Sequence, residues 1–319
     1  MKRFFCVLLI VLLLPWVVPT ATAQHSLGLS AASAVLIDAH TLQVLYAHNA
    51  HMPMPVASTT KIMTTLLLLE AGQPQLAFTA TQEMVQVEGT SMGLRAGDTV
   101  TREALAIGML LASGNDAANA AAMHLAGSLE AFSLLMNNRA RALGMTRTHF
   151  VTPSGLDAEG HLSTAFDMAL LGAAAIANPA FRAISSQSSM RAHFGNPPAW
   201  HYLRNHNRLV RELPGCIGVK TGFTRAAGRT LVSAVERNGR TLVAVTLNAP
   251  NDWQDHRRLY EFGFAQYQRM ELDIAGDLVA RLPITNGIIS HANIILVGTP
   301  AAYLQARPQN VQRVLLLAI

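Results

Sequence analysis

The middle of the sequence, residues 102–172, differs in character from the segments on either side of it. It is rich in alanine, leucine and methionine, which favour helices. The flanking segments instead carry short apolar runs that are typical of strands. This alternation predicts an α+β fold in which an all-helical lobe is inserted into a sheet-forming chain. Breaks in the lobe are expected at Ser113-Gly114, Gly127-Ser128, Gly144 and 152–161.

The predicted strands form one antiparallel sheet flanked by helices. They are residues 33–38, 43–47, 217–221, 230–236 and 241–247. Asn238-Gly239 predicts a two-residue type I′ turn between the last two strands.

Two helices outside the lobe complete the predicted domain. A helix is expected over residues 57–69, where apolar residues recur at helical spacing before Gly72. The second is expected over residues 253–266. Within the lobe, Thr164 and Asp167 resemble a capping box at the start of its last helix.

The two ends of the chain differ from its middle. Lys2 and Arg3 precede an apolar run that ends before Ala21-Thr22-Ala23, so residues 1–23 read as a secretory signal. Residues 24–268 are predicted to form the main domain, and residues 269–319 a short β-rich appendage. Short apolar runs at 278–282, 294–297 and 314–319 are its expected strands. The last run is too short to span a membrane.

Composition excludes several classes of protein. Half of the residues are apolar and only 13% are charged, which suits a large folded core. The net charge of +5 is scattered along the chain, so nucleic acid is not expected as a partner. Cys216 is the only cysteine beyond the signal, so no internal disulfide is expected. We expect an exported protein, in the periplasm or at the outer face of the cytoplasmic membrane.

Beyond the signal the chain has only two lysines, Lys61 and Lys220, whereas it has about twenty arginines. A buried lysine can lose its proton and act as a base, which arginine cannot. Each lysine also lies in a short motif. These are Ser58-Thr59-Thr60-Lys61 and Lys220-Thr221-Gly222, with Ser113-Gly114-Asn115 between them.

The first motif fits nucleophilic catalysis. On a helix, residues three apart share a face, so Ser58 and Lys61 would project together. A serine hydroxyl needs a nearby base, and Lys61 would serve if burial and a second positive charge lowered its pKa. Lys220 would be that second charge. Alone, this spacing occurs often by chance, and a surface serine and lysine would be the simpler interpretation.

The other two motifs fit substrate binding. Lys220 and the Thr221 hydroxyl could hold a carboxylate, and Gly222 would let a substrate backbone lie against the strand edge. Ser113 offers a hydroxyl for proton relay, and Asn115 an amide that donates and accepts. Each is a common tripeptide by itself. Their order, with a helical insert between the first and third motifs, makes chance an unsatisfactory explanation.

The combination resembles the serine D-alanyl-D-alanine carboxypeptidases, the low-molecular-mass penicillin-binding proteins. The likeness covers residues 24–268. It extends to the sequences at 57–64, 91–94, 113–118, 155–157, 160–165, 205–209 and 218–224.

The resemblance implies roles for particular residues. Ser58 would be the acylated nucleophile, Lys61 the base and Ser113 the proton relay. Asn115 would bind the substrate amide, and Lys220 with Thr221 the terminal carboxylate. The implied oxyanion hole consists of the backbone N–H groups of Ser58 and Phe223. The implied partners are peptidoglycan stem peptides ending in D-Ala-D-Ala, and β-lactams as covalent inhibitors. The resemblance also allows peripheral association with the membrane.

The sequence also departs from the family pattern. Ser154 occupies a loop position where the family often has histidine. No arginine on the last helix is placed as a carboxylate partner, although Arg257 and Arg258 are nearby candidates.

The same residues are compatible with other functions. A β-lactamase needs a deacylation base, and Glu159 and Asp157 are the acidic candidates in the 152–161 loop, but their setting does not match the lactamase pattern. DD-endopeptidase activity and a non-catalytic peptidoglycan-binding role are further alternatives.

Several residue types are expected to be structural. No metal or cofactor is predicted, because the histidines lack ligand spacing with carboxylate support. His201, His206 and His256 are expected in loops or caps. Cys216 is expected to be a buried small hydrophobe.

Overall fold

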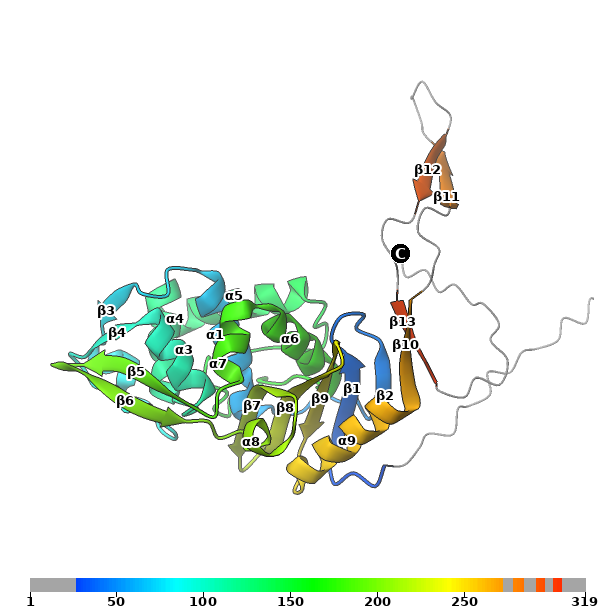
Figure 1. The fold of residues 1–319 in the computed structure, drawn as a ribbon. Coiled ribbons are helices and arrows are strands. Elements are labelled where there is room, and N and C mark those ends of the chain that lie inside the picture. Colours follow the sequence, from blue (N-terminus) through cyan, green and yellow to red (C-terminus); the bar gives the residue numbers. More distant parts are fainter. Residues whose placement is uncertain (1–26, 272–277, 284–290, 296–300, 306–319) are drawn as a thin grey trace, which may run out of the picture.

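The computed structural model describes residues 27–271, 278–283, 291–295 and 301–305. Its centre is an antiparallel five-stranded sheet in the order β2-β1-β9-β8-β7 (Figure 1). The strands are β1 (Ser33–Asp38), β2 (Val44–His48), β7 (Cys216–Thr224), β8 (Gly228–Arg237) and β9 (Arg240–Leu247). All five predicted strands are therefore present in one sheet, which confirms the α+β class.

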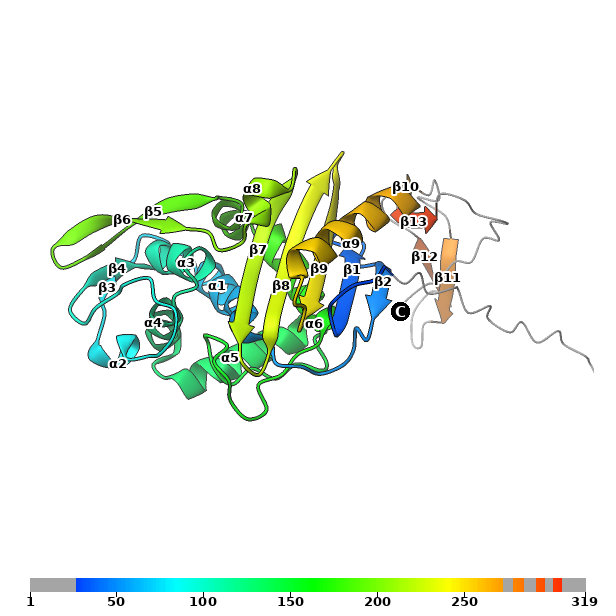
Figure 2. The same ribbon diagram turned by 90° about the horizontal axis from the view of Figure 1, so that it is seen from below.

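Helices cover both faces of this sheet. Helix α9 (Asp252–Gln266) lies on one face, and α6 (Ala165–Ala177) packs on β1, β8 and β9 from the other (Figure 2). Because both faces are covered, β1 is buried along its whole length. Gly172 of α6 permits the close approach, since a Cβ there would lie 3.0 Å from methyl groups of Val232 and Val243.

The helical lobe lies beside the β7 edge of the sheet. Within residues 102–172 it contains α3 (Arg102–Leu110), α4 (Asn115–Ala126), α5 (Leu129–Ala142) and the first part of α6. The flanking segments add the 3₁₀ turn η1 (Ala57–Thr60) with α1 (Lys61–Glu70), α2 (Gln82–Val85), α7 (Pro179–Ser185) and α8 (Leu209–Glu212). Gly127 ends α4 in a left-handed conformation, and Ser128 caps α5 through its side chain. The predicted helix breaks are thus confirmed.

A second sheet that was not predicted lies at the edge of the lobe, but none of its strands falls within residues 102–172, for which an all-helical lobe was predicted. Its strands are β3 (Ala77–Thr79), β4 (Thr99–Thr101), β5 (Ser189–Gly195) and β6 (Pro198–Arg204), in that order. The first two are only three residues long, too short for periodicity to be visible. The β5–β6 hairpin extends from the lobe in both views (Figures 1 and 2).

Local details of the prediction were partly right. Asn238 and Gly239 both have positive φ and join β8 to β9, as a type I′ turn requires. Thr164 caps α6 by accepting the Asp167 N–H, but the Asp167 carboxylate accepts from Arg147 N and Thr148 Oγ1. The capping box is therefore only half formed.

The last described residues form two small two-stranded sheets. Strand β10 (Tyr267–Glu271) pairs with β13 (Ala301–Gln305), and β11 (Leu278–Pro283) pairs with β12 (His291–Ile295). The predicted signal at 1–23 and the strand at 314–319 lie outside the described residues. Among the described residues, no single helix is long and apolar enough to cross a membrane; α6 and α7 pass that test only as a pair bent by 100°.

Candidate active site

Ser58 lies in the 3₁₀ turn that precedes α1, at the junction of the lobe and the sheet. Ala57 enters the turn with a φ of 47°, an uncommon conformation for a residue with a side chain. The Val56 carbonyl accepts hydrogen bonds from Thr59 Oγ1 at 2.5 Å and from Thr230 Oγ1 on β8 at 3.1 Å. The turn that carries Ser58 is thus fastened to the sheet.

Lys61 begins α1 and is fully buried. Its Nζ lies 3.0 Å from Ser58 Oγ, and it donates to Asn115 Oδ1 at 2.6 Å and to the Ser154 carbonyl at 2.8 Å. Three oxygens therefore fix the amine beside the Ser58 hydroxyl. The backbone of Ser154, rather than its side chain, performs this contact.

The electrostatics of both lysines favour the neutral form of Lys61. Burial, and then the nearby charge of Lys220, hold the pKa of Lys61 well below its usual value, although Asp116 opposes the shift. Burial also lowers the pKa of Lys220 to about 7. The expected conditions for a lysine base, burial and a second positive charge, are both present.

The Ser113-Gly114-Asn115 loop is held by the segment before α3. Ser113 has a φ of 60°, and its carbonyl accepts from Thr90 Oγ1 at 2.6 Å. Asn115 Nδ2 donates to the Glu88 carbonyl at 2.7 Å, and Asn115 N donates to the Thr90 carbonyl. The Asn115 side chain therefore links Lys61 to this segment and has only part of its hydrogen-bonding capacity left.

Asp116 organises the same region, a role that the sequence analysis did not assign. Its buried carboxylate accepts hydrogen bonds from Ser91 Oγ and from the backbone N–H groups of Met92, Gly93 and Leu94. Buried carboxylates need such partners. The similarity noted at residues 91–94 thus marks a segment that this carboxylate holds in place.

Strand β7 presents the third motif. Lys220 is buried and donates to the Thr221 carbonyl at 2.7 Å, whereas Phe223 is 66% exposed. A Cβ on Gly222 would lie 2.4 Å from Thr230 Oγ1 and 2.9 Å from Ser58 N. The expectation that Gly222 makes room for substrate was therefore incomplete: the missing side chain makes room for the Ser58 turn.

One cavity of about 390 Å³ brings most of the predicted residues together. Its lining includes Ser58, Ser113, Asn115, Thr221, Gly222 and Phe223. Lys61 and Lys220 are buried beside it. We call it the Ser58 cavity.

Arg229, which was not among the predicted site residues, also lines the Ser58 cavity. It lies on β8 opposite Phe223 and forms a 2.9 Å ion pair with the buried Asp252. Its Nε is buried without a hydrogen-bond partner among the described residues. The Trp253 ring lies 5.4 Å from its guanidinium carbon. The strand was predicted to begin at residue 230, so Arg229 fell outside it.

The arginines that had been considered on the last helix have other contacts. Arg257 pairs with Glu212 at 2.9 Å, and Arg258 donates to the Gly28 carbonyl. Neither lines the Ser58 cavity.

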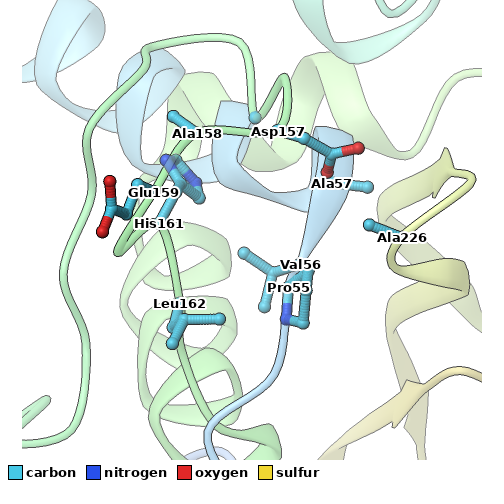
Figure 3. Close-up of a pocket in the computed structure, with 10 residues that line it drawn as sticks. Pro55, Val56, Ala57, Asp157, Ala158, Glu159, His161, Leu162 and Ala226 are labelled. Carbon is cyan, nitrogen blue, oxygen red and sulfur yellow. The ribbon is translucent and has the colours of Figure 1, made fainter.

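A second cavity, of about 310 Å³, is lined by residues of the 152–161 loop. Figure 3 shows Glu159 and His161 on one side of it and Asp157 near Ala57. Asp157 Oδ1 accepts from Thr224 Oγ1 at 2.9 Å. Neither Asp157 nor Glu159 lines the Ser58 cavity.

The histidine predictions need correction. His201 lies in β6, stacked on Phe194, and His256 is buried within α9 between Ser233 Oγ and Thr246 Oγ1. Burial lowers the pKa of His256 to about 3. His206 does lie in a loop, and it lines the Ser58 cavity. The contacts of these histidines join residues far apart in the chain, so a single sequence does not predict them.

Cys216 is buried in the core, as predicted. Burial raises the pKa of its thiol to about 11. Within the described part of the chain, no three metal-ligating side chains are grouped; the absence of a metal remains a prediction.

Comparison with known proteins places this site in a family. The model of Peptidase S11, D-alanyl-D-alanine carboxypeptidase, matches residues 20–251. The D-alanyl-D-alanine carboxypeptidase DacF of Bacillus subtilis is 32% identical over 303 residues, covering 90% of this chain and 77% of that protein. A D-alanyl-D-alanine endopeptidase of Escherichia coli is 32% identical over 235 residues, covering 72% of this chain and 74% of that protein.

A solved structure supports the same family assignment. The crystal structure of a D-alanyl-D-alanine carboxypeptidase from Mycobacterium tuberculosis has a TM-score of 0.70 and 35% identity, covering 74% of this chain and 91% of that one. The chain belongs to the Peptidase S11 family, the serine-type D-alanyl-D-alanine carboxypeptidases.

Proposed function

We propose that this hydrolase removes the terminal D-alanine from peptidoglycan stem pentapeptides through an acyl-enzyme on Ser58. The observation that carries the proposal is the 3.0 Å contact between Ser58 Oγ and a buried Lys61 whose pKa is lowered. A neutral amine at this distance can accept the hydroxyl proton as the oxygen attacks the peptide carbonyl.

Acylation follows from the same geometry. The attack forms a tetrahedral intermediate, whose oxyanion would accept from the backbone N–H groups of Ser58 and Phe223. Close contact of Gly222 with Ser58 N supports this pairing. The C–N bond then breaks, the proton on Lys61 passes by way of Ser113 to the leaving amine, and D-alanine departs. Water hydrolyses the ester and restores Ser58.

The substrate carboxylate would bind at the β7 end of the Ser58 cavity. Thr221 offers a hydroxyl and Lys220 a nearby charge, as the resemblance implied. Arg229 adds a guanidinium that lines the same cavity. We assign Arg229 the carboxylate contact that could not be assigned to the last helix.

Two alternatives use the same nucleophile. Endopeptidase activity is supported by the similarity to a protein of that name, and cross-linked peptide dimers would test it. β-Lactamase activity needs a carboxylate base at the acyl-enzyme, and Glu159 lines the second cavity instead. A β-lactam should therefore acylate Ser58, and the resulting acyl-enzyme should hydrolyse slowly.

The location of the protein is also a proposal. We infer that it acts outside the cytoplasm, because residues 1–23 have the pattern of a secretory signal. Association with the outer face of the membrane is compatible with this, and fractionation of cells that express the full chain would test both.

The deciding experiment measures D-alanine release from a synthetic pentapeptide ending in D-Ala-D-Ala. Wild type should release D-alanine and Ser58→Ala should not, and a penicillin adduct should map to Ser58 by mass spectrometry. A folded wild-type protein that releases no D-alanine would overturn the proposal.

A further inference from the structure

The β5–β6 hairpin presents one face to the core and the other to solvent. Phe194 and Leu203 on the inner face are buried. On the outer face, Trp200 is 64% exposed and Tyr202 70% exposed, among the largest exposures of apolar side chains in the described chain. Exposed aromatic groups gathered on one surface indicate an interaction site.

The outer face is also basic. Cross-strand pairing places Arg191 opposite Tyr202, and His193 opposite Trp200. The Arg191 guanidinium lies 5.3 Å from the Trp200 ring centroid. Residues 189–204 contain no aspartate or glutamate, and none of the ion pairs of the described residues involves Arg191 or Arg204. We call Arg191, His193, Trp200, Tyr202 and Arg204 the hairpin strip.

The hairpin strip runs toward the Ser58 cavity. Strand β6 ends at Arg204, and two residues later His206 lines that cavity. At ~3.3 Å per strand residue, Tyr202 and Trp200 lie ~13 to 20 Å along the chain from His206. An extended pentapeptide spans ~17 Å. A stem peptide with its end in the cavity can therefore have its attachment point near the strip.

We propose that the hairpin strip binds the glycan strand of peptidoglycan while a stem peptide occupies the Ser58 cavity. Sugar rings would stack on Trp200 and Tyr202, whose faces are flat, rigid and apolar. Arg191 and Arg204 would pair with carboxylates of neighbouring stem peptides. The strip fits a linear polymer because its groups form two facing rows on adjacent strands, and the β6 row ends two residues before His206, which lines the cavity. The proposal rests on the proposed function, since it concerns the polymeric form of the same substrate.

The test compares a soluble with a polymeric substrate. In Trp200→Ala/Tyr202→Ala, D-alanine release from the soluble pentapeptide should stay unchanged. Release from insoluble pentapeptide-rich peptidoglycan, and cosedimentation with it, should fall about tenfold. Leu134→Ala, which removes a 66% exposed side chain from α5, is the matched control and should change neither.

A second pair of variants leaves the aromatic rings intact. Arg191→Gln and Arg204→Gln should each weaken cosedimentation with peptidoglycan and reduce its sensitivity to salt. Equal rates of the aromatic double variant and wild type on the insoluble polymer would overturn the proposal. The proposal would also be overturned if the aromatic double variant still cosedimented with peptidoglycan but no longer bound phosphatidylglycerol vesicles. That result would show that the hairpin strip binds a membrane surface. Failure of the proposed function itself would be distinct, because wild type would then not turn over the soluble pentapeptide.

Discussion

Lys61 Nζ and Ser58 Oγ lie 3.0 Å apart, and both residues come from the short segment where the 3₁₀ turn passes into α1. The local helix geometry brings them together, but the charge state of the amine depends on its burial and on the charge of Lys220, which is 159 positions further along the chain. The nucleophile and its base therefore form a local unit whose reactivity depends on burial and on a distant strand.

The pH dependence of acylation should follow this coupling. Lys220→Gln removes a positive charge that lowers the pKa of Lys61, so the pKa of Lys61 should rise and the acidic limb of the rate profile should move to higher pH. Rates of penicillin acylation, measured by stopped flow across pH, would check this. Lys220→Arg keeps the charge and should keep the limb close to its wild-type position. A limb that stays in place in Lys220→Gln would contradict the coupling.

Removal of Arg229 should weaken recognition of the substrate carboxylate. Arg229→Gln is expected to lower kcat/KM for the pentapeptide by roughly 10- to 100-fold, the loss of a charged hydrogen bond of ~1.5 to 3 kcal/mol. A pentapeptide with an amidated C-terminus should lose much less. Arg225→Gln, an exposed position on the neighbouring turn, is the control. Equal losses for the acid and the amide would argue against a carboxylate contact.

A side chain at position 222 should displace the nucleophile. In Gly222→Ala the new Cβ would lie 2.9 Å from Ser58 N and 2.4 Å from Thr230 Oγ1, so the Ser58 turn must shift. We expect a loss of ~1 to 3 kcal/mol in unfolding free energy from overpacking, with acylation at least tenfold slower. Thermal melting and penicillin acylation measure the two effects separately. Wild-type values for both would show that the strand edge has more room than the structure implies.

Neutralising Asp116 should loosen the segment that holds the Ser113 loop. Asp116→Asn turns one acceptor atom into a donor facing the N–H groups of residues 92–94, at a cost of ~2 to 4 kcal/mol in unfolding free energy. Urea denaturation would measure it. Asp98→Asn is the matched control, because Asp98 is also buried but, within the described part of the chain, its carboxylate accepts a backbone bond only from Arg95. Equal losses of unfolding free energy in the two variants would mean that the additional hydrogen bonds of Asp116 contribute no extra stability.

Much of the site could be predicted because its chemistry is carried by local sequence. The spacing of Ser58 and Lys61 is a helical relationship, and Lys220 to Gly222 form a strand with a following turn. The Asn238-Gly239 turn was also local, since both residues tolerate positive φ. Gly222 shows the limit: the motif was recognised, but the atoms that forbid a side chain come from Ser58 and Thr230.

The sequence by itself determined the α+β class, the strands of the main sheet and the residues of the three motifs. Only the tertiary structure decided that Arg229 lines the same cavity as Ser58, that Asp116 holds residues 91–94 and that Glu159 lines a different cavity. The tertiary structure also decided that β5 pairs with β6 and that the aromatic side chains on one face of this hairpin are exposed. The physical reason is the range of the interactions. Periodicity and turn preferences act over a few residues, whereas these contacts join residues far apart in the chain and exist only once the sheet and the lobe have packed.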